Sequence, residues 1–489
     1  MLRPWKVTLS ERIDVSRAVP VYMQIIQALI RDIESGRLTS GTYLPSSRDL
    51  ASALGVNRKT VVLAYEDLIA QGWLSSAGTR GTMVSSSLPE PALTRQDGAG
   101  EQARSEIAAE YRFAEPPARP LALPAGKGLK LDEGAPDGRL FPSEVLARAY
   151  RSAVQRASRS NGLQYRDPRG TPALRESIAA MLKSQRGLAV TAANICITRG
   201  SQNGIFLATQ VLIQPGDAVV VEELTYEPAV AAFRACGAKI VPVRLDGDGM
   251  NVDDLEKACR RESVRAVFVT PHHQFPTTVA LRPERRLRML ELARQFGFAI
   301  IEDDYDHEFH FESQPLLPMA GYAPNRVIYV GSLSKLLLPA LRIGYIAAPS
   351  AVIDAVAHMI SLVDGMGNTL TEDAAAELIE NGELRRHARK VRQVYERRRQ
   401  AFATSLDTIL GDLIDFDTPD GGLAFWLHFK RLADLDKVEE RAPAMGLRFA
   451  SSRSFMTSDS APRGLRIGFA SLGEVEARDA IRALRAAVG

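Results

Sequence analysis

The apolar run Val327-Ile328-Tyr329-Val330 leads into the polar turn Ser332-Leu333-Ser334-Lys335, and Arg342 follows seven residues after the lysine. A short, near-continuous apolar run is typical of a strand that is covered on both faces of a parallel sheet. Serine hydroxyls and an arginine suit a phosphate group, and a lysine amine can form a Schiff base with an aldehyde. The stretch therefore predicts a covered sheet with a site for a phosphorylated aldehyde at a strand end.

A second stretch, Ile300-Ile301-Glu302-Asp303-Asp304-Tyr305, precedes the first by about thirty residues and also turns from apolar to polar side chains. An aspartate here can pair with the protonated nitrogen of a pyridine ring, while the lysine holds the aldehyde of the same molecule. Together the two stretches meet the requirements of a pyridoxal phosphate (PLP) site.

Length and composition set the broad class of the protein. The 489 residues are too many for one hydrophobic core, so at least two domains are expected. Hydrophobic content of 45% and charged content of 24% are typical of globular proteins. The three cysteines have no paired spacing, which favours a reducing compartment over disulfides or a metal cluster. No apolar run reaches the roughly 18 residues of a membrane span, and Met1–Lys6 lacks a signal-peptide core, so we expect a cytoplasmic protein without membrane contact.

The net charge of +3 is unevenly distributed. Residues 1–85 contain ten lysines and arginines against seven acidic residues, which leaves the rest of the chain neutral. A basic excess in one segment is the electrostatic signature of contact with nucleic acid. The N-terminal segment is therefore the candidate DNA-binding part.

Residues 18–84 show three helical patterns followed by two short strands around a glycine turn. Two helices joined by a tight turn and followed by a β-hairpin form a winged helix-turn-helix. The expected elements are the helices Val21–Ser35, Pro45–Leu54 and Arg58–Ala70 and the strands Gly72–Leu74 and Gly78–Val84.

The rest of the chain predicts a linker and an α/β domain. Residues 85–125 are rich in Ser, Pro, Gly, Ala and charge, which predicts a flexible linker before the domain at 126–489. In this domain, short apolar strands alternate with helical patterns, so we expect a mostly parallel sheet that is covered on both faces. Residues 349–489 predict a smaller α+β subdomain that closes one side of a cleft. The expected strands are Ile195–Thr198, Ala218–Val221, Ala266–Thr270, Ala299–Ile301 and Val327–Val330.

Several polar residues of the N-terminal segment are candidate DNA contacts. An arginine at a helix start can reach a phosphate or a guanine edge. Polar donors at the N-terminus of the next helix suit the major groove, and an arginine at the wing tip suits the minor groove or the backbone. A solvated surface charge remains the alternative for any one of them, above all for Lys59. The candidates are Arg48, Asn57, Arg58, Lys59, Thr60 and Arg80.

The motif that begins Gly36-x-Leu38-x-x-Gly41-x-x-Leu44-Pro45-Ser46-Ser47-Arg48 and ends Leu54-Gly55-Val56-Asn57-Arg58-Lys59-Thr60-Val61 resembles the GntR-type winged-helix signature. The C-terminal region resembles the fold-type I PLP enzymes, the aspartate aminotransferase superfamily, in several motifs that occur in the same order. Joined together, the two parts resemble a MocR/GabR-type transcriptional regulator. This resemblance implies a winged helix fused to a fold-type I domain that binds PLP.

The resemblance also implies roles for single residues. Lys335 is the Schiff-base lysine, Asp303 pairs with the pyridine nitrogen, and Tyr305 donates a hydrogen bond to the phenolic oxygen of the cofactor. The neighbouring Asp304 and Glu302 are expected to be solvated or helix-end carboxylates.

Further residues follow the same family pattern. The phosphate is expected in a cup that includes backbone N–H groups at a helix start. Tyr226 is expected to stack on the pyridine ring, and Tyr165 to reach the phosphate of the partner subunit in a homodimer. Arg466 is expected to hold the carboxylate of an effector, because its planar fork fits that group. The cup residues are Ser201, Gln202, Ser332, Ser334 and Arg342.

One region departs from the enzymes. Many fold-type I enzymes have Asn-Pro-x-Gly where this chain has Phe275-Pro276-Thr277-Thr278, so the asparagine that assists the phenolic oxygen is absent. His273 and Gln274 are the candidates to replace it. We expect no metal site at His272 and His273, because adjacent residues in a strand point to opposite faces.

These features favour a regulator that binds PLP and a double-stranded DNA operator and responds to an amine, an amino acid or PLP itself. Closure of the small subdomain would then change how two winged helices are held on two half-sites. The alternative is an active aminotransferase with an accessory DNA-binding domain. A third possibility is a GntR-type repressor whose large domain has lost the cofactor, which the intact Asp303, Tyr305, Lys335 and Arg342 argue against.

Overall fold

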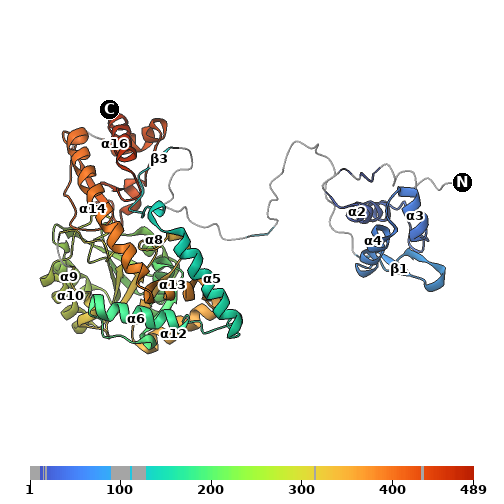
Figure 1. The fold of residues 1–489 in the computed structure, drawn as a ribbon, viewed down its shortest axis with the longest axis horizontal. Coiled ribbons are helices and arrows are strands. Elements are labelled where there is room, and N and C mark those ends of the chain that lie inside the picture. Colours follow the sequence, from blue (N-terminus) through green and yellow to red (C-terminus); the bar gives the residue numbers. More distant parts are fainter. Residues whose placement is uncertain are drawn as a thin grey trace. The chain divides into compact units, whose positions relative to one another are not determined.

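The chain forms two compact units, Met1–Glu115 and Pro116–Gly489, and each is described by itself (Figure 1). Most of the expected linker at 85–125 lies outside the described residues, so the prediction for it stays open. The computed structural model describes residues 12–14, 16, 19–89, 111–112, 128–312, 315–430 and 434–489.

The N-terminal unit is a winged helix-turn-helix, as the sequence predicts. Helices α2 and α3 both pack against α4, and the antiparallel strands β1 and β2 form the wing. Their inward-facing apolar residues, among them Leu29, Val61 and Leu68, make one core. The elements are α2 (Val21–Glu34), α3 (Ser47–Leu54), α4 (Arg58–Ala70), β1 (Leu74–Ser76) and β2 (Thr82–Val84), with a 3-10 turn at Gly78–Arg80.

The tight turn between α3 and α4 is encoded locally. Ser46 caps α3 by accepting a hydrogen bond from the backbone of Asp49 at 3.2 Å. Gly55 ends α3 in the left-handed conformation, with φ of 64°, which glycine adopts without a Cβ penalty. Asn57 then caps α4 by accepting from the backbone of Lys59 at 2.9 Å. These caps fix the start of α4, where the candidate DNA contacts lie.

A seven-stranded sheet organises the large unit. Its strand order is β4-β12-β11-β10-β9-β5-β6, and β12 alone runs antiparallel to its neighbours among the described strands. The mostly parallel sheet of the α/β prediction is therefore confirmed. The strands are β4 (Ile195–Thr198), β5 (Ala218–Glu222), β6 (Lys239–Val243), β9 (Val264–Val269), β10 (Ala299–Asp304), β11 (Val327–Ser332) and β12 (Gly344–Ala347).

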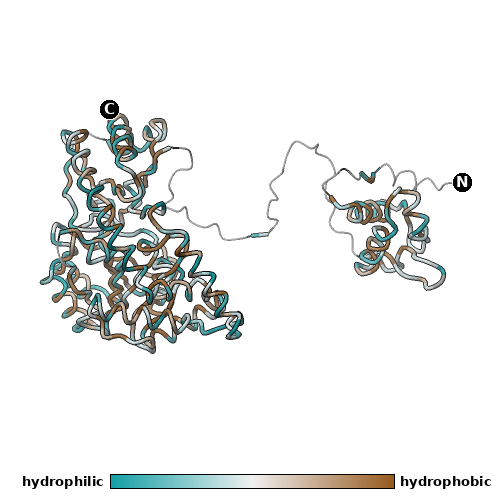
Figure 2. The backbone as a smooth tube through the Cα atoms, in the orientation of Figure 1, coloured by the Kyte–Doolittle hydropathy of each residue, from teal (hydrophilic) through white to brown (hydrophobic). Residues whose placement is uncertain are grey.

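Both faces of this sheet are covered. Ile300 and Val327 point into the larger hydrophobic core, while Ile301 and Ile328, one residue further on, point into a second core. This alternation accounts for the near-continuous apolar runs in the sequence. Figure 2 shows the hydrophobic interior and the mixed hydropathy of the surrounding helices. The helices are α5 (Ser143–Arg159), α6 (Pro172–Arg186), α7 (Ser201–Leu212), α8 (Glu227–Ala235), α9 (Val252–Arg261), α10 (Pro283–Phe296), α11 (Met319–Tyr322), α12 (Ser350–Val363) and α13 (Thr369–Glu380).

The C-terminal part forms a smaller α+β layer. Its antiparallel strands β13, β14 and β16 pack with long helices. The segment at the start of the large unit also belongs here, because Leu129–Lys130 (β3) pairs in parallel with Leu447–Arg448 (β15). The other elements are β13 (Ile414–Asp415), β14 (Ala424–Phe429), β16 (Leu465–Gly468), α14 (Glu383–Leu410), α15 (Leu435–Arg441) and α16 (Glu474–Val488).

Candidate functional site

The predicted cofactor residues converge at the ends of the central strands. Asp303 lies near the end of β10, Ser332 ends β11, and Lys335 lies in the loop that follows. The Nζ atom of Lys335 is 4.6 Å from the centre of the Tyr305 ring, and its charge acts on Asp303. The fold thus brings the two stretches that predicted the site to one place.

The amine of Lys335 is partly buried and is held by the protein backbone. It donates a hydrogen bond of 2.7 Å to the backbone carbonyl of Gly134. Burial lowers the pKa of Lys335 from 10.5 to about 8, against the opposing effect of Asp306. A lysine of this kind is a nucleophile near neutral pH.

Asp303 presents a carboxylate oxygen that lacks a partner. The residue is only 4% exposed, and its Oδ1 has no hydrogen-bond donor among the described residues. Burial, together with Asp304 and Asp306, raises the pKa of Asp303 to about 8, and Lys335 opposes the shift. Buried carboxylate oxygens are normally hydrogen-bonded, so this atom fits a group that donates, such as a protonated ring nitrogen.

The start of α7 and Arg342 face each other across a glycine. A Cβ added at Gly200 would lie 3.0 Å from the Nη2 atom of Arg342, so only glycine leaves the space beside the guanidinium. Arg342 itself is held by the carbonyl of Arg199 at 2.9 Å. Two further polar atoms, the Ser334 hydroxyl and the Gln202 side-chain oxygen, are buried without a hydrogen-bond partner in the described structure. Free N–H groups at a helix start, a hydroxyl and a guanidinium form a site for a phosphate.

Tyr226 borders the same space. Its ring lies edge-on to Phe275, with ring centres 5.1 Å apart. Burial raises the pKa of the Tyr226 hydroxyl, and the charges of Asp303 and Glu133 raise it further. The ring is thus placed beside Asp303, where stacking on a pyridine is possible.

Arg466 is fixed by the protein itself. It is 1% exposed, its Nε donates to the Glu133 carbonyl at 2.8 Å, and its Nη1 donates to the Pro276 carbonyl at 2.8 Å. Its Nη2 lies 3.3 Å from the Tyr305 hydroxyl, and the guanidinium stands 4.5 Å from the centre of the Phe275 ring. Carbonyls and a hydroxyl orient this buried guanidinium, and its charge acts on the carboxylates of Glu133 and Asp306.

The two candidates for the missing asparagine are already engaged. The amide of Gln274 donates to Glu222, to the Leu224 carbonyl and to the Phe275 carbonyl, and its oxygen accepts two bonds from Thr277. His273 instead pairs its Nδ1 with Asp306 at 2.7 Å. The Tyr305 hydroxyl donates to the carbonyl of His273 at 2.8 Å. Both candidate side chains therefore have protein partners in this structure.

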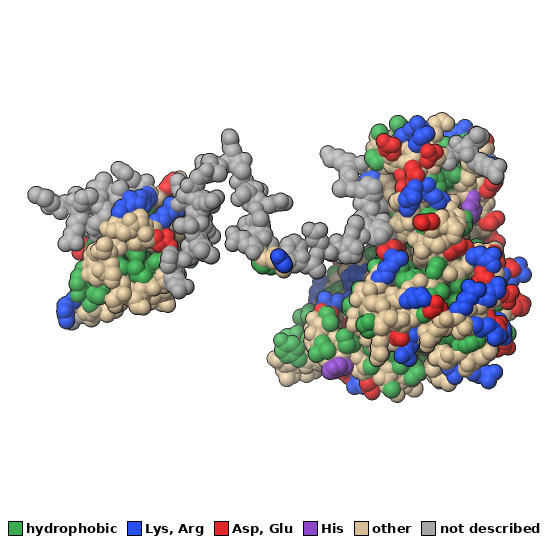
Figure 3. All heavy atoms as spheres, turned by 180° about the vertical axis from the view of Figure 1, so that it is seen from behind, with side chains coloured by type: hydrophobic (Ala, Val, Ile, Leu, Met, Phe, Trp, Pro, Cys, Tyr) green, Lys and Arg blue, Asp and Glu red, His purple; other side chains and the backbone are tan. Residues whose placement is uncertain are grey.

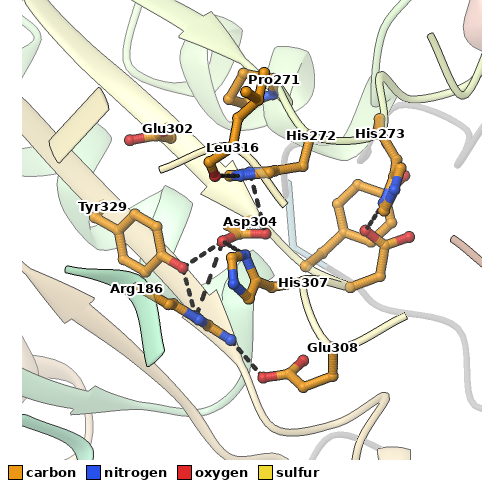
Figure 4. A network of polar contacts seen from close by, with 12 residues as sticks. Arg186, Pro271, His272, His273, Glu302, Asp304, His307, Glu308, Leu316 and Tyr329 are labelled. Carbon is orange, nitrogen blue, oxygen red and sulfur yellow. Dashed lines mark hydrogen bonds and ion pairs between the residues drawn. The ribbon is translucent and has the colours of Figure 1, made fainter. Parts of the chain in front are cut away.

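The expectation for Asp304 is wrong. Asp304 is neither solvated nor at a helix end, because it lies at the centre of a fully buried polar network (Figure 4). Tyr329 donates to its Oδ2, and the Nη1 atom of Arg186 lies 4.0 Å from the same oxygen. Glu302 is a helix-end carboxylate as expected, but a buried one, and it accepts bonds of 2.9 and 3.0 Å from the first two N–H groups of α11.

The loop at 132–134 was missed by the sequence reasoning. The carbonyls of Glu133 and Gly134 hold Arg466 and Lys335, and the Glu133 side chain contains a buried oxygen without a hydrogen-bond partner in the described part. The loop lies beside the site because β3 pairs with the distant β15. A single acidic residue and a glycine after a linker give no sequence signal of this.

The candidate DNA contacts lie on the surface of the N-terminal unit. Arg48, Asn57, Arg58 and Lys59 are exposed, and Thr60 is half-buried. The Nε of Arg58 is 3.3 Å from the hydroxyl of Ser47, which joins the starts of α3 and α4. Arg80 is exposed in the 3-10 turn of the wing. Figure 3 shows lysine and arginine side chains on this unit, and mixed charges over the large one.

Tyr165 lies apart from the other predicted residues. It is 89% exposed and follows α5 in the loop that leads to α6. A tyrosine that is so exposed in one chain is available to a second chain.

In the described residues, no helix is long and apolar enough to cross a membrane.

Two family models match the chain. Residues 126–484 match the class I and II aminotransferases, and residues 21–84 match the bacterial regulatory proteins of the gntR family. The class I and II aminotransferase family implies the use of PLP. The solved structure of the α-aminoadipate aminotransferase LysN from Thermus thermophilus, complexed with a phosphopyridoxyl-leucine, has a TM-score of 0.68 and 27% identity. It covers 74% of this chain and 92% of its own.

Two curated proteins resemble the chain at equal identity. The aromatic-amino-acid aminotransferase 1 of Thermococcus litoralis is 31% identical over 73% of this chain and 87% of its own length. The probable rhizopine catabolism regulatory protein MocR of Rhizobium meliloti is 31% identical over 97% of this chain and 95% of its own length. The second match spans both units, and the first spans the aminotransferase part alone. The chain therefore belongs to the MocR-type transcriptional regulators, in which a GntR-family DNA-binding domain is joined to an aminotransferase class I and II domain.

Proposed function

We propose that the large unit binds PLP through Lys335. We further propose that a small amine, an amino acid or PLP itself changes the affinity of the winged helix for its operator. The observation that carries the proposal is the unpartnered Oδ1 of the buried Asp303 beside a lysine of lowered pKa. A protonated ring nitrogen supplies the donor which that oxygen lacks. When bound, PLP supplies an aldehyde and an electron-withdrawing ring.

The other residues of the site would each contact a different part of the cofactor. The N–H groups at the start of α7, with Ser201 and the Ser332–Ser334 turn, bind the phosphate together with Arg342. Tyr226 would pack on the ring, and Tyr305 would lie beside the cofactor next to Lys335. The unpartnered Ser334 hydroxyl and the glycine beside Arg342 support this division.

The effector is proposed to bind next to the cofactor and to bring a carboxylate to Arg466. The guanidinium is already oriented by the carbonyls of Glu133 and Pro276, so little conformational entropy is lost on binding. The exposed Tyr165 supports a homodimer in which this residue reaches the partner's phosphate site. A ligand shifts such a dimer between two arrangements only as far as it binds one of them better.

The visible absorption spectrum of the purified protein tests the proposal. PLP that is bound to Lys335 gives a visible band, and an effector amine is expected to shift it. The same compound should then change operator affinity in a gel-shift titration. A protein that shows no band after PLP is supplied would overturn the cofactor half of the proposal.

An active aminotransferase remains the second candidate. The likeness to the Thermococcus aminotransferase and the complete set of site residues favour it. Keto-acid formation from amino acids, measured over many turnovers per chain, distinguishes the two. Steady turnover would support the enzyme, while a single stoichiometric conversion supports the sensor.

The rate of PLP capture is expected to depend on pH through Lys335. The neutral amine is the nucleophile, so a pKa lowered to about 8 leaves about a quarter of the lysine reactive at pH 7.5, against roughly one in a thousand at a pKa of 10.5. The initial rate for cofactor-free protein should therefore rise about tenfold per pH unit below pH 7 and level off above about pH 8.5. Stopped-flow absorbance measures it. A rate that still rises steeply above pH 9 contradicts the lowered pKa.

Replacing Arg58 with alanine is expected to weaken operator binding. Loss of a contact to a base or a phosphate costs about 1–3 kcal/mol, which corresponds to roughly a 5- to 150-fold higher Kd. Fluorescence anisotropy with labelled operator measures the change, and Arg31→Ala, an exposed arginine on α2, is the matched control. Equal Kd values for Arg58→Ala and wild type would show that the DNA-recognition surface does not include Arg58.

Replacing Arg466 with alanine is expected to blunt the response to a carboxylate effector. A charged hydrogen-bonded contact contributes about 1.5–3 kcal/mol, so the concentration for half-response should rise roughly 10- to 100-fold. The matched control is the corresponding amine without a carboxylate, whose weaker response should not change. If both compounds lose potency equally, Arg466 acts on the fold rather than on the carboxylate.

A further inference from the structure

A second cluster of titratable side chains is formed by His272, Asp304 and His307, which are not among the proposed PLP contacts (Figure 4). His272, Asp304 and His307 are buried, and one ligand atom from each lies within 4.8 Å of the others. The Nδ1 of His272 is 3.6 Å from the Oδ1 of Asp304, and the Nδ1 of His307 is 3.0 Å from its Oδ2. Two imidazole nitrogens and a carboxylate thus face one point.

The hydrogen bonding around His272 leaves its Nδ1 without a proton to donate. The Nε2 of His272 is 2.6 Å from the carbonyl of Leu316, and a carbonyl can only accept, so the proton is on Nε2. In the neutral ring, Nδ1 is then a lone pair that faces the carboxylate of Asp304. The Nδ1 of His272 and the Oδ1 of Asp304 are buried without a hydrogen-bond partner in the described residues, whereas the Nδ1 of His307 pairs with the Oδ2 of Asp304 at 3.0 Å. Acceptors that face each other in a dry interior repel unless a cation lies between them.

The surroundings of the cluster resemble the second shell of a metal site. Tyr329 donates to the Oδ2 of Asp304, and the guanidinium of Arg186 lies 4.0 Å from the same oxygen, which leaves Oδ1 as the free ligand atom. The carbonyl of Leu316 fixes the tautomer and orientation of His272. Metal-binding histidines and carboxylates are normally oriented by such partners.

An access route is also present. A cavity of about 700 Å³ is lined by His272, His273, His310 and Leu316 on one side and by Trp426 on the other. The Nε2 of His310 is buried without a hydrogen-bond partner in the described part, and its ring centre is 6.0 Å from that of His272 and 5.8 Å from that of His307. A cavity that reaches the cluster gives an ion and its water a way in.

We propose that His272, Asp304 and His307 bind a divalent transition-metal ion, with Zn²⁺ as the best fit. Two imidazoles and one carboxylate are a common ligand set for zinc, with a fourth position for water or another group. Bonds of about 2.0–2.1 Å hold tetrahedral ligand atoms about 3.3 Å apart, close to the 3.6 Å between the Nδ1 of His272 and the Oδ1 of Asp304. The Nδ1 of His307 lies 3.0 Å from the other oxygen of the same carboxylate. The proposal revises the expectation of a chain without metal. That expectation considered the pair of His272 and His273, which do point to different carboxylates, Asp304 and Asp306.

The position of the site gives it a consequence for the fold. Asp304 follows Asp303 on β10. His272 precedes the loop that contains Pro276, whose carbonyl accepts a hydrogen bond from Arg466. A bound ion would tie the end of β10 to that loop. Metal binding to the folded chain alone stabilises it in proportion to the logarithm of the metal concentration.

The test is metal content and metal-dependent stability of the untagged full chain. Protein stripped with a chelator, incubated with Zn²⁺ and desalted is expected to retain one zinc per chain by plasma mass spectrometry. His307→Ala and Asp304→Asn should retain less than about a fifth of that amount, because two remaining ligands bind zinc weakly. His358→Ala, an exposed histidine on α12, is the matched control and should retain the full equivalent.

A second measurement distinguishes the loss of a metal ligand from misfolding of the variant. His307→Asn removes the ligand while keeping a polar side chain, and near-ultraviolet circular dichroism without metal should match the wild type. Added zinc should then raise the melting temperature of the wild type and of His358→Ala, but not that of His307→Asn. Wild-type protein that holds less than a fifth of an equivalent, or a His307→Asn protein that holds as much zinc as wild type, overturns the proposal.

Discussion

Replacing Lys335 with alanine is expected to abolish covalent attachment of PLP, the largest single effect that the site predicts. The lysine supplies the amine nucleophile, which the carbonyl of Gly134 holds and whose pKa is lowered to about 8. After borohydride reduction and denaturation, wild-type protein should carry one cofactor per chain and the variant only background. Mass spectrometry of the intact chain gives both values directly.

Two controls make this result specific. Lys335→Arg keeps the positive charge beside Tyr305 but cannot form the covalent bond, so it should also lose the trapped cofactor. Lys183→Ala removes an exposed lysine on α6 and should keep full labelling. Cofactor that stays covalently trapped in Lys335→Ala would show that a different lysine is the attachment point.

Replacing Gln274 with alanine is expected to cause the largest loss of stability among the substitutions considered. Its amide joins Glu222, two backbone carbonyls and both donors of Thr277 in a buried network. Removing it leaves several buried polar groups unpaired, and each such group costs about 1–3 kcal/mol. We expect the free energy of unfolding of the large unit to fall by about 3 kcal/mol or more.

Urea denaturation followed by near-ultraviolet circular dichroism measures this loss. Gln393→Ala, an exposed glutamine on α14, is the control and should change the free energy of unfolding by less than about 0.5 kcal/mol. Because the loop after Gln274 carries the Pro276 carbonyl that orients Arg466, the variant should also respond less to a carboxylate effector. An unfolding free energy equal to that of wild type would mean that water replaces the amide in this network.

The fold was predictable from the sequence because its signals are local. The winged helix follows from caps such as Ser46, Gly55 and Asn57, which act within four residues of themselves. The covered sheet follows from apolar runs that alternate between two cores. Lys335 stands out because a reactive lysine after a strand is marked by neighbouring serines and an arginine.

The hydrogen-bond and ion-pair partners of Asp304 and Gln274 were not predictable from the sequence. Asp304 and Asp303 are adjacent residues of the same type, so the sequence does not distinguish them. In the structure, Asp304 forms an ion pair with Arg186, which lies on α6, more than a hundred residues away. Gln274 was a candidate for touching the cofactor, whereas its amide is saturated by Glu222 and the backbone. In both cases, the partner is distant in the sequence.

The sequence by itself determined the winged helix, the mostly parallel covered sheet and five of its strands, since these depend on periodicity, caps and short motifs. Only the tertiary structure decided which oxygen is left without a partner, which carbonyls orient Lys335 and Arg466, and which histidines share a carboxylate. The physical reason is that burial and hydrogen-bond pairing are set by contacts between distant segments. A buried polar group takes its properties from whichever partner the fold places within about 3 Å.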